Sequence, residues 1–161
     1  MSRNIIISKR DGSKEELDLE KMHKVVFYAC EGVTGVSASE VEIKSHISFY
    51  NGIETKDVQE TLIKSAADLI SEETPNYQWV AGRLINYHLR KIVYNSFEPE
   101  HLKDIARRNV DLGIYDESFF AVYNEQEIEQ LNNFIKHERD ENISYVGMEQ
   151  FRGKYLAQNR A

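Results

Sequence analysis

Hydrophobic positions divide the chain into one short region of β character and a series of helical segments. Residues 4–8 are mainly β-branched and apolar, and Asp11-Gly12 is a dipeptide typical of tight hairpin turns. This pattern predicts a strand, a turn and a second strand near residues 15–17. Ile53 is expected to add a third short strand, so the β part of the fold is small.

Four helices are predicted next, because apolar residues recur every three or four positions. Asp18 and Thr55 are suitable N-caps, Ser37 with Glu40 has the spacing of a capping box, and Thr74-Pro75 has the favoured N-cap and N1 arrangement. The fourth helix is apolar around most of its circumference, which indicates a central, buried element. In chain order, the predicted helices cover residues 18–32, 37–52, 55–69 and 74–92.

The second of these helices is extended by Ile43, Ile47 and Tyr50, which keep the helical spacing up to Asn51-Gly52. Its predicted end is therefore the glycine that precedes Ile53.

The later part of the chain is also helical, and Phe97-Glu98-Pro99 separates it from the first part. One apolar face begins at Leu102 and closes near Gly113, and Asn124 with Glu127 forms another cap pair. The residues that continue the second face are Ile128, Leu131, Phe134 and Ile135, and a last helix is expected near residues 144–154. We predict a mainly α fold with a small β-cap, divided into a domain at 1–96 and a helical segment at 97–161.

The charge and composition of the chain exclude several classes of function. The 161 residues carry a formal net charge of -7, and a net acidic chain is a poor general binder of nucleic acid. No apolar run is long enough to span a membrane, and the first residues do not resemble a signal peptide. The single cysteine, Cys30, excludes an internal disulfide and a multi-cysteine zinc site. These features predict a cytoplasmic protein.

The sequence contains no known catalytic pattern, but several of its cationic residues could belong to a phosphate-binding pocket. There is no Gly-rich phosphate loop, and the five histidines lack metal-ligand spacing. Cys30 lies on the apolar side of the first helix and is expected to be a small buried hydrophobe. Phosphate binding needs cations and hydroxyl or N–H donors, which are supplied by Lys9, Arg10, Lys21, Thr55 and Lys91. From this pattern alone, a solvated surface and an anion pocket both stay open.

Several motifs nevertheless resemble an ATP-cone, which is a four-helix bundle capped by a small three-stranded sheet. They are Ser8–Met22, Gly52–Glu60 and Pro75–Leu84, followed by Leu89-Arg90-Lys91. Three later motifs look like the stretch that follows the cone in the large (alpha) subunit of class Ia aerobic ribonucleoside-diphosphate reductase: Gly113–Asp116, Tyr123–Glu127 and Gly153–Arg160. In that family the cone is the overall-activity site, where ATP permits turnover and dATP inhibits it in some members.

The resemblance implies a role for each matching residue. Lys9, Arg10 and Lys91 would hold the triphosphate of ATP or dATP together with Mg²⁺, and Thr55 would donate to a phosphate. Glu15 would accept a hydrogen bond from the adenine amino group. The remaining implied contacts are Asp18 near the base, Lys21 at the phosphate or ribose side, Ile7 and Met22 packed against the base, and Gln59 at the ribose.

Two positions differ from the family pattern. Gln59 stands where relatives inhibited by dATP commonly have His, and Asp18 stands where Asn is common. Gln can hydrogen-bond a ribose hydroxyl but cannot become a cation. The resemblance therefore implies nucleotide binding and leaves inhibition by dATP open.

The resemblance also implies what this chain cannot do alone. The family's reaction needs a radical-bearing cysteine, a redox-active cysteine pair in a barrel domain and a C-terminal cysteine pair, and Cys30 matches none of them. We expect a regulatory domain whose partners are the rest of the large subunit and the small (beta) radical-generating subunit. Two alternatives stay open: a degenerate cone with only a structural or assembly role, and a stand-alone ATP-cone regulator. The latter would need a four-cysteine ribbon and a basic face, which this chain lacks.

Overall fold

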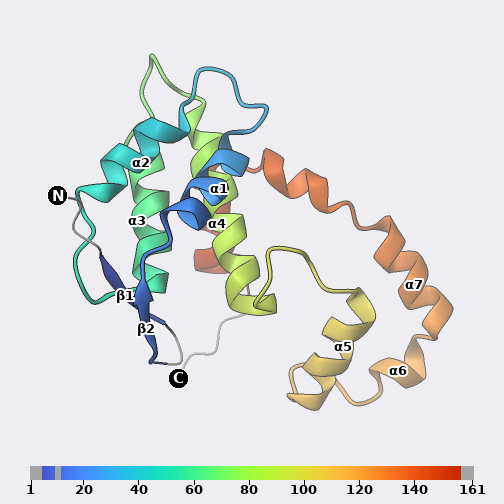
Figure 1. Ribbon diagram of the computed structural model, residues 1–161. Helices are drawn as coiled ribbons and strands as arrows, with labels where there is room; N and C mark the ends of the chain where they lie inside the picture. Colours follow the sequence, from blue (N-terminus) through green and yellow to red (C-terminus); the bar gives the residue numbers. More distant parts are fainter. Residues whose placement is uncertain (1–4, 10–11, 157–161) are drawn as a thin grey trace. The chain divides into compact units, whose positions relative to one another are not determined.

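The computed structural model describes residues 5–9 and 12–156, which group into two compact units. The first unit contains the described residues up to His88 and those from Glu141 onward, and the second spans Leu89–Asp140. The sequence boundary expected at residue 96 stays a prediction. Each unit is described by itself below, with the elements labelled in Figure 1.

A three-stranded sheet forms the β-cap of the first unit. Its strands are β1 (Ile6–Ser8), β2 (Lys14–Glu16) and β3 (Ile53–Glu54), in the order β2-β1-β3. β1 pairs with β2 in antiparallel fashion and with β3 in parallel fashion. The hairpin and the third strand predicted from the sequence are confirmed, and Gly12 in the turn has a φ of 81°, which favours glycine. Asp11 and Arg10 lie outside the described residues.

Two helices follow the hairpin, α1 (Leu19–Cys30) and α2 (Ala38–His46). Asp18 caps α1 as predicted, because its carboxylate accepts from the backbone N–H of Lys21 at 3.0 Å. The capping box predicted for Ser37 and Glu40 is wrong. Ser37 occupies the N-cap position of α2, but its side chain makes no capping hydrogen bond, and the Glu40 carboxylate accepts instead from the hydroxyl of Tyr77.

The predicted length of α2 is also wrong. The helix ends at His46, whereas the apolar spacing extended it to Gly52. Ile43, Ile47 and Tyr50 are all exposed, and Ile47 retains 83% of its surface. The described residues of the first unit therefore leave these side chains largely exposed, and packing, which is the main source of helix stability in proteins, gives little support to another turn.

Tyr77, the first residue of α4 (Tyr77–Tyr94), links this helix to the start of α2 through its hydroxyl. Removing the hydroxyl should destabilise the contact between the two helices. The side chain is fully buried; its hydroxyl donates to Glu40 and accepts from the backbone N–H of Ser37 at 2.9 Å. Burial and the Glu40 hydrogen bond raise the pKa of Tyr77 to about 12. Tyr77→Phe leaves two polar groups without this partner, so we expect a loss of about 2 kcal/mol in the free energy of unfolding.

Urea unfolding of the whole chain measures this loss. Tyr28→Phe is the matched control, because Tyr28 lies on α1 with 56% of its surface exposed. An equal stability for Tyr77→Phe and the wild type would contradict the assigned role of the hydroxyl.

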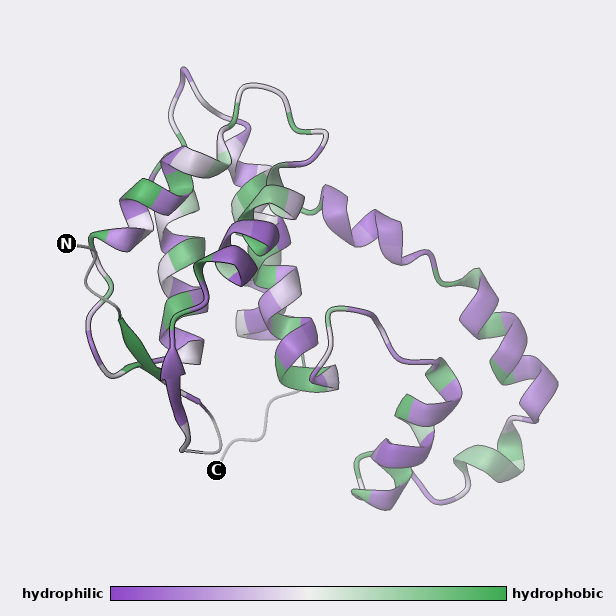
Figure 2. Ribbon diagram, viewed as in Figure 1, coloured by the Kyte–Doolittle hydropathy of each residue, from purple (hydrophilic) through white to green (hydrophobic). Residues whose placement is uncertain are grey.

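The core of the first unit lies between α3 (Thr55–Ala67) and the N-terminal half of α4. Figure 2 shows hydrophobic residues along both helices. The prediction of a central fourth helix is confirmed for this half, although α4 begins two residues after Pro75 rather than at it. The fully buried large side chains include Val26, Val41, Leu62, Tyr77, Val80, Leu84 and Ile85.

The chain returns to the first unit through α8 (Tyr145–Gln150) and the π-helical turn η2 (Phe151–Tyr155), close to the last helix predicted at 144–154. The segment that leads into α8 packs directly on α4. A Cβ added to Gly82 would lie 2.2 Å from the carbonyl oxygen of Ile143. Next to it, the Arg83 side chain donates from Nε to the carbonyl of Glu141 at 3.2 Å and from Nη1 to the carbonyl of Glu31 at 2.6 Å.

The second unit contains α5 (Leu102–Asp111), α6 (Phe119–Val122) and α7 (Glu125–Phe134), and the 3-10 helix η1 (His137–Asn142) begins in it. The capping box of Asn124 and Glu127 is confirmed, with both reciprocal hydrogen bonds present. The predicted apolar face of α7 is buried only at Ile128, while Phe134 keeps 74% of its surface. Figure 2 accordingly shows α7 as mainly hydrophilic.

None of the helices in residues 5–9 and 12–156 combines the length and the apolar character that crossing a membrane requires.

Candidate functional site

The β-cap brings together residues from three parts of the sequence. Ile7 occupies the central strand, opposite Glu15 on one side and Ile53 on the other. Its side chain is buried with those of Ile53 and Val58. Ile7 therefore belongs to a small core beneath the sheet, and its predicted contact with an adenine base stays a prediction.

Lys9 and Glu15 form an ion pair between the two arms of the hairpin. The Lys9 ammonium lies 2.5 Å from the Glu15 carboxylate, and both side chains are about two-fifths exposed. The predicted phosphate cation and the predicted adenine acceptor thus contact each other directly. A ligand that used both groups would have to share or replace this pair.

The start of α1 presents the next three predicted residues. The Asp18 carboxylate caps α1 by accepting a hydrogen bond from the backbone N–H of Lys21. This hydrogen bond holds the pKa of the Asp18 carboxyl below its usual value. The Lys21 ammonium lies 3.6 Å from the same carboxylate and is largely exposed. Met22 is buried. The start of α1 thus offers one exposed cation, Lys21, and two carboxylates, those of Asp18 and Glu20.

The start of α3 is joined to β1 by Thr55. The hydroxyl of Thr55 donates to the backbone carbonyl of Ser8 at 3.2 Å, directly before Lys9 in the chain. Thr55 is the first residue of α3 rather than its N-cap, a position that Glu54 occupies without a side-chain capping bond. Gln59 lies four residues further along, on the same face of the helix, and is half-buried.

Lys91 belongs to the second unit. Its ammonium donates to the carbonyl of Asn95 at 2.9 Å and lies 5.1 Å from the centroid of the Phe97 ring. Arg10, the remaining predicted site residue, lies outside the described residues. The structure thus brings Ile7, Lys9, Glu15 and Thr55 together at the β-cap, with Asp18, Lys21 and Met22 in the helix that follows β2.

A groove close to the start of α1 does not coincide with these residues. The groove has a volume of about 540 Å³ and lies between α1 and α2. Its lining includes Leu19, Met22, His23, Glu42, Ile43 and His46. Of the predicted site residues that the structure describes, Met22 alone lines it, so the groove is a surface separate from the Lys9–Glu15 pair. His23 and Glu42 form a hydrogen bond of 2.7 Å across it.

Neither thiol chemistry nor a metal centre emerges from the described part of the chain. Burial raises the pKa of the half-buried Cys30 thiol to about 11, so the thiol is protonated at neutral pH. Among the described residues, no group of three or more His, Cys, Asp or Glu side chains is arranged to hold a metal ion.

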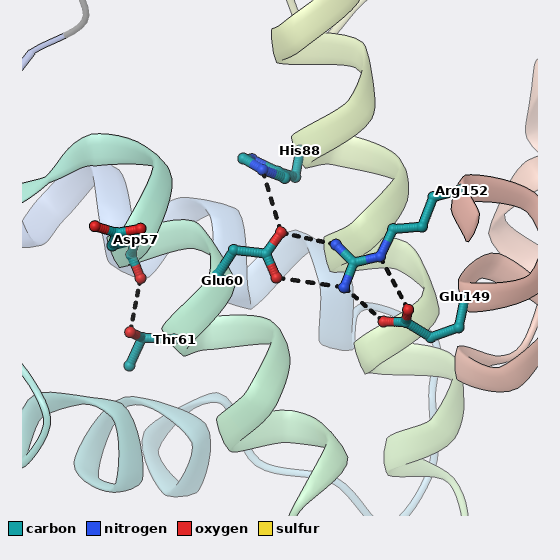
Figure 3. Close-up of polar contacts among 6 residues, drawn as sticks. All are labelled: Asp57, Glu60, Thr61, His88, Glu149 and Arg152. Carbon is teal, nitrogen blue, oxygen red and sulfur yellow. Dashed lines mark hydrogen bonds and ion pairs between the residues drawn. The ribbon is translucent and has the colours of Figure 1, made fainter. Parts of the chain in front are cut away.

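Sequence reasoning missed one polar cluster entirely. Glu60 of α3, His88 of α4, Glu149 of α8 and Arg152 of η2 meet in the first unit, as Figure 3 shows. Arg152 is 92 residues away from Glu60 in the chain, and no local spacing links the two. The only available signal was the position of Glu60, directly after the predicted contact Gln59.

Comparisons with known proteins agree with the motifs. A sequence model described as the ATP cone domain matches residues 5–92. The chain is 49% identical over 160 residues to "Ribonucleoside-diphosphate reductase 1 subunit alpha" of Escherichia coli (strain K12), and 51% identical over 160 residues to the subunit alpha of Buchnera aphidicola subsp. Acyrthosiphon pisum (strain APS). The subunit alpha of Enterobacteria phage T4 is 39% identical over 158 residues. The matches cover 97–99% of this chain but 21% of each relative, so the chain spans about a fifth of their length.

Proposed function

Because this chain belongs to the ATP cone family, we propose that it binds ATP or dATP with Mg²⁺ as an allosteric effector. In this proposal it is the overall-activity regulatory domain of the large subunit of a cytoplasmic ribonucleoside-diphosphate reductase. The partners are the rest of that subunit and the small radical-generating subunit. In this proposal catalysis belongs to the larger protein, because Cys30 matches none of the cysteines that the resemblance implies for the reaction.

One observation carries the proposal: the contact between the Thr55 hydroxyl and the Ser8 carbonyl at 3.2 Å. It holds the start of α3 against the strand that leads into Lys9. A helix start supplies N–H groups and the positive end of the helix dipole, and a neighbouring lysine supplies a cation. These are the groups that a phosphate needs, and they come from segments 46 residues apart in the sequence.

The Lys9–Glu15 pair supplies the second half of the argument. In the structure each group neutralises the other, and the pair links the two arms of the hairpin at an exposed site. A nucleotide offers both groups new partners at once, since phosphate replaces the carboxylate for Lys9 and the adenine amine replaces the ammonium for Glu15. We propose that Arg10, Lys21 and Lys91 add charge around the phosphates. Ile7, Met22 and Asp18 would lie near the base, and Gln59 near the ribose.

Nucleotide-dependent thermal stability tests the proposal. A single site saturated at one hundred times its Kd adds about 2.7 kcal/mol to the stability of the folded state. For a chain of this size that corresponds to a rise in Tm of roughly 5–10 °C. We expect this rise with ATP and with dATP in the presence of Mg²⁺, measured by calorimetry, and little change with Mg²⁺ alone.

The same measurement separates the alternative. A degenerate cone with only a structural role would show no rise in Tm with either nucleotide, and that result would end the proposal. Calorimetric titration of Gln59→His and of the wild type then measures whether the imidazole changes the ratio of the affinities for ATP and dATP. The two nucleotides differ at the ribose hydroxyl that residue 59 is proposed to face.

A further inference from the structure

A guanidinium lies between two carboxylates on the side of α3 next to the proposed site. Arg152 donates from Nη1 to Glu60 at 2.7 Å and from Nη2 to the second oxygen of Glu60 at 3.3 Å. It also donates from Nε and Nη2 to the two oxygens of Glu149, at 3.0 and 2.6 Å. Figure 3 shows the guanidinium reaching between Glu60 of α3 and Glu149 of α8, with His88 of α4 at the same Glu60 oxygen that Nη1 contacts.

The cluster is partly shielded from water, and this shielding strengthens the electrostatic interactions between its charged groups. The Arg152 side chain is 26% exposed and that of His88 is 6% exposed. The hydrogen bond to Glu149 raises the pKa of the Arg152 guanidinium; burial opposes this and the bond to Glu60 adds to it. Arginine is always protonated in proteins at ordinary pH, so Arg152 is a permanent cation. Bidentate guanidinium–carboxylate pairs of this kind fix geometry as well as charge.

The start of α3 is acidic, and this matters for an anionic ligand. Its first residues include the carboxylates of Glu54, Asp57 and Glu60. Lys56 pairs with Glu54 at 3.0 Å, and Arg152 pairs with Glu60. Among the described residues, Asp57 has no such pairing with a Lys or Arg side chain, and without Arg152 Glu60 would keep only His88, whose Nε2 lies 3.4 Å away.

The geometry of α3 determines how close Glu60 lies to the proposed nucleotide site. Glu60 follows Gln59 directly, so it is displaced from it by 1.5 Å along the axis and about 100° around it. Thr55 and Gln59 are four residues apart and share the face that is proposed to meet the nucleotide. The Glu60 carboxylate thus lies within the same turn, on the order of 10 Å from any ligand held there, which is about the Debye length at moderate salt.

We infer that Arg152 is a positioning residue for the nucleotide: by neutralising Glu60 it permits an anion at the start of α3, and it ties the occupancy of that site to the docking of η2 on α3. This inference rests on the proposed function. Coupling of this kind is reciprocal, so a bound nucleotide should also hold η2 and α8 more firmly.

Calorimetric titrations of the whole chain with ATP, ADP and adenosine, each with Mg²⁺, test the inference. We expect Arg152→Gln to weaken ATP binding about fivefold, since an uncompensated charge at this distance repels the anion. The loss should be smaller for ADP and absent for adenosine, and it should shrink at high salt. Arg152→Lys should retain most of the affinity, because it keeps the charge. Lys154→Gln is the matched control, since it removes an exposed cation from the same turn and should change binding by less than about twofold.

The double variant Glu60→Gln/Arg152→Gln distinguishes charge from structure. It should restore ATP affinity to within about twofold of the wild type, because the carboxylate that repels the ligand is gone. It also keeps the inference testable if Arg152→Gln alone fails to fold. Hydrogen exchange of residues 145–155 should slow on addition of ATP to the wild type, and this protection should be lost in Arg152→Gln.

Two outcomes overturn the inference alone: wild-type affinity for ATP in Arg152→Gln, or an equal loss for ATP and adenosine, which would indicate a purely structural role. If the wild type itself binds no adenine nucleotide, the proposed function fails and the inference fails with it.

Discussion

Gly82→Ala should lower the free energy of unfolding by about 2 kcal/mol and release the segment that leads into α8. The added methyl group would lie 2.2 Å from the carbonyl oxygen of Ile143 and 3.0 Å from the carbonyl carbon of Ser144. Both are backbone atoms, so the whole segment must move to make room. The change also brings a gain, because alanine is favoured over glycine inside a helix by about 1 kcal/mol. We expect the clash to exceed this gain.

Thermal unfolding should show the effect as a fall in Tm of roughly 5 °C for a chain of this length. Hydrogen exchange at residues 143–150 should become faster than in the wild type. Gly153→Ala is the control, because a Cβ there meets nothing within 4 Å. If Gly82→Ala were as stable as the wild type, α4 and the Ile143 backbone could not lie as close as the structure places them.

The sequence predicted well those elements whose signals are local. The Asp18 cap and the capping box of Asn124 and Glu127 each depend on a few neighbouring residues. A capping group within three residues of its partner forms with little loss of chain entropy, so tertiary contacts seldom displace it. Such features can be read from spacing alone.

Contacts between distant residues explain the errors. Ser37 and Glu40 have capping-box spacing, but Tyr77 arrives from α4 and takes the Glu40 carboxylate. Ile47 continues a helical pattern that the first unit leaves exposed, and α2 ends before it. The local spacing was present in both places. A distant contact decided the outcome at Glu40, and the lack of burial at Ile47 decided where α2 ends.

The candidate site divides in the same way. The resemblance placed Lys9, Glu15 and Thr55 together, and the described β-cap indeed joins their segments. It could not indicate that Lys9 and Glu15 pair with each other, or that Arg152 reaches Glu60 from 92 residues away. Long-range ion pairs follow from the return of the chain to α4, which no spacing in the sequence encodes.

Exchanging Lys9 and Glu15 should abolish nucleotide binding while preserving the β-cap. Lys9→Glu/Glu15→Lys keeps one ion pair across the hairpin, in the opposite sense. An exposed pair contributes at most about 1 kcal/mol to stability, so the Tm without ligand should stay within a few degrees of the wild type. Binding is different, because a carboxylate would face the phosphates and an ammonium the adenine amine. Juxtaposed like charges cost several kcal/mol, so we expect calorimetry to show more than a hundredfold loss of ATP affinity.

The neighbouring pair on β2 supplies the matched control. Lys14 and Glu16 flank Glu15 and, by the alternation of a strand, lie on the opposite face of the sheet. Lys14→Glu/Glu16→Lys makes the same charge exchange within a few ångströms of the site, so it should leave ATP affinity nearly unchanged. Loss of binding in the first exchange but not in the second would place the ligand on the Glu15 face. If both exchanged variants bound ATP as tightly as the wild type, Lys9 and Glu15 would not belong to the site. A bound triphosphate cannot accept a carboxylate in place of its lysine without a measurable loss of affinity.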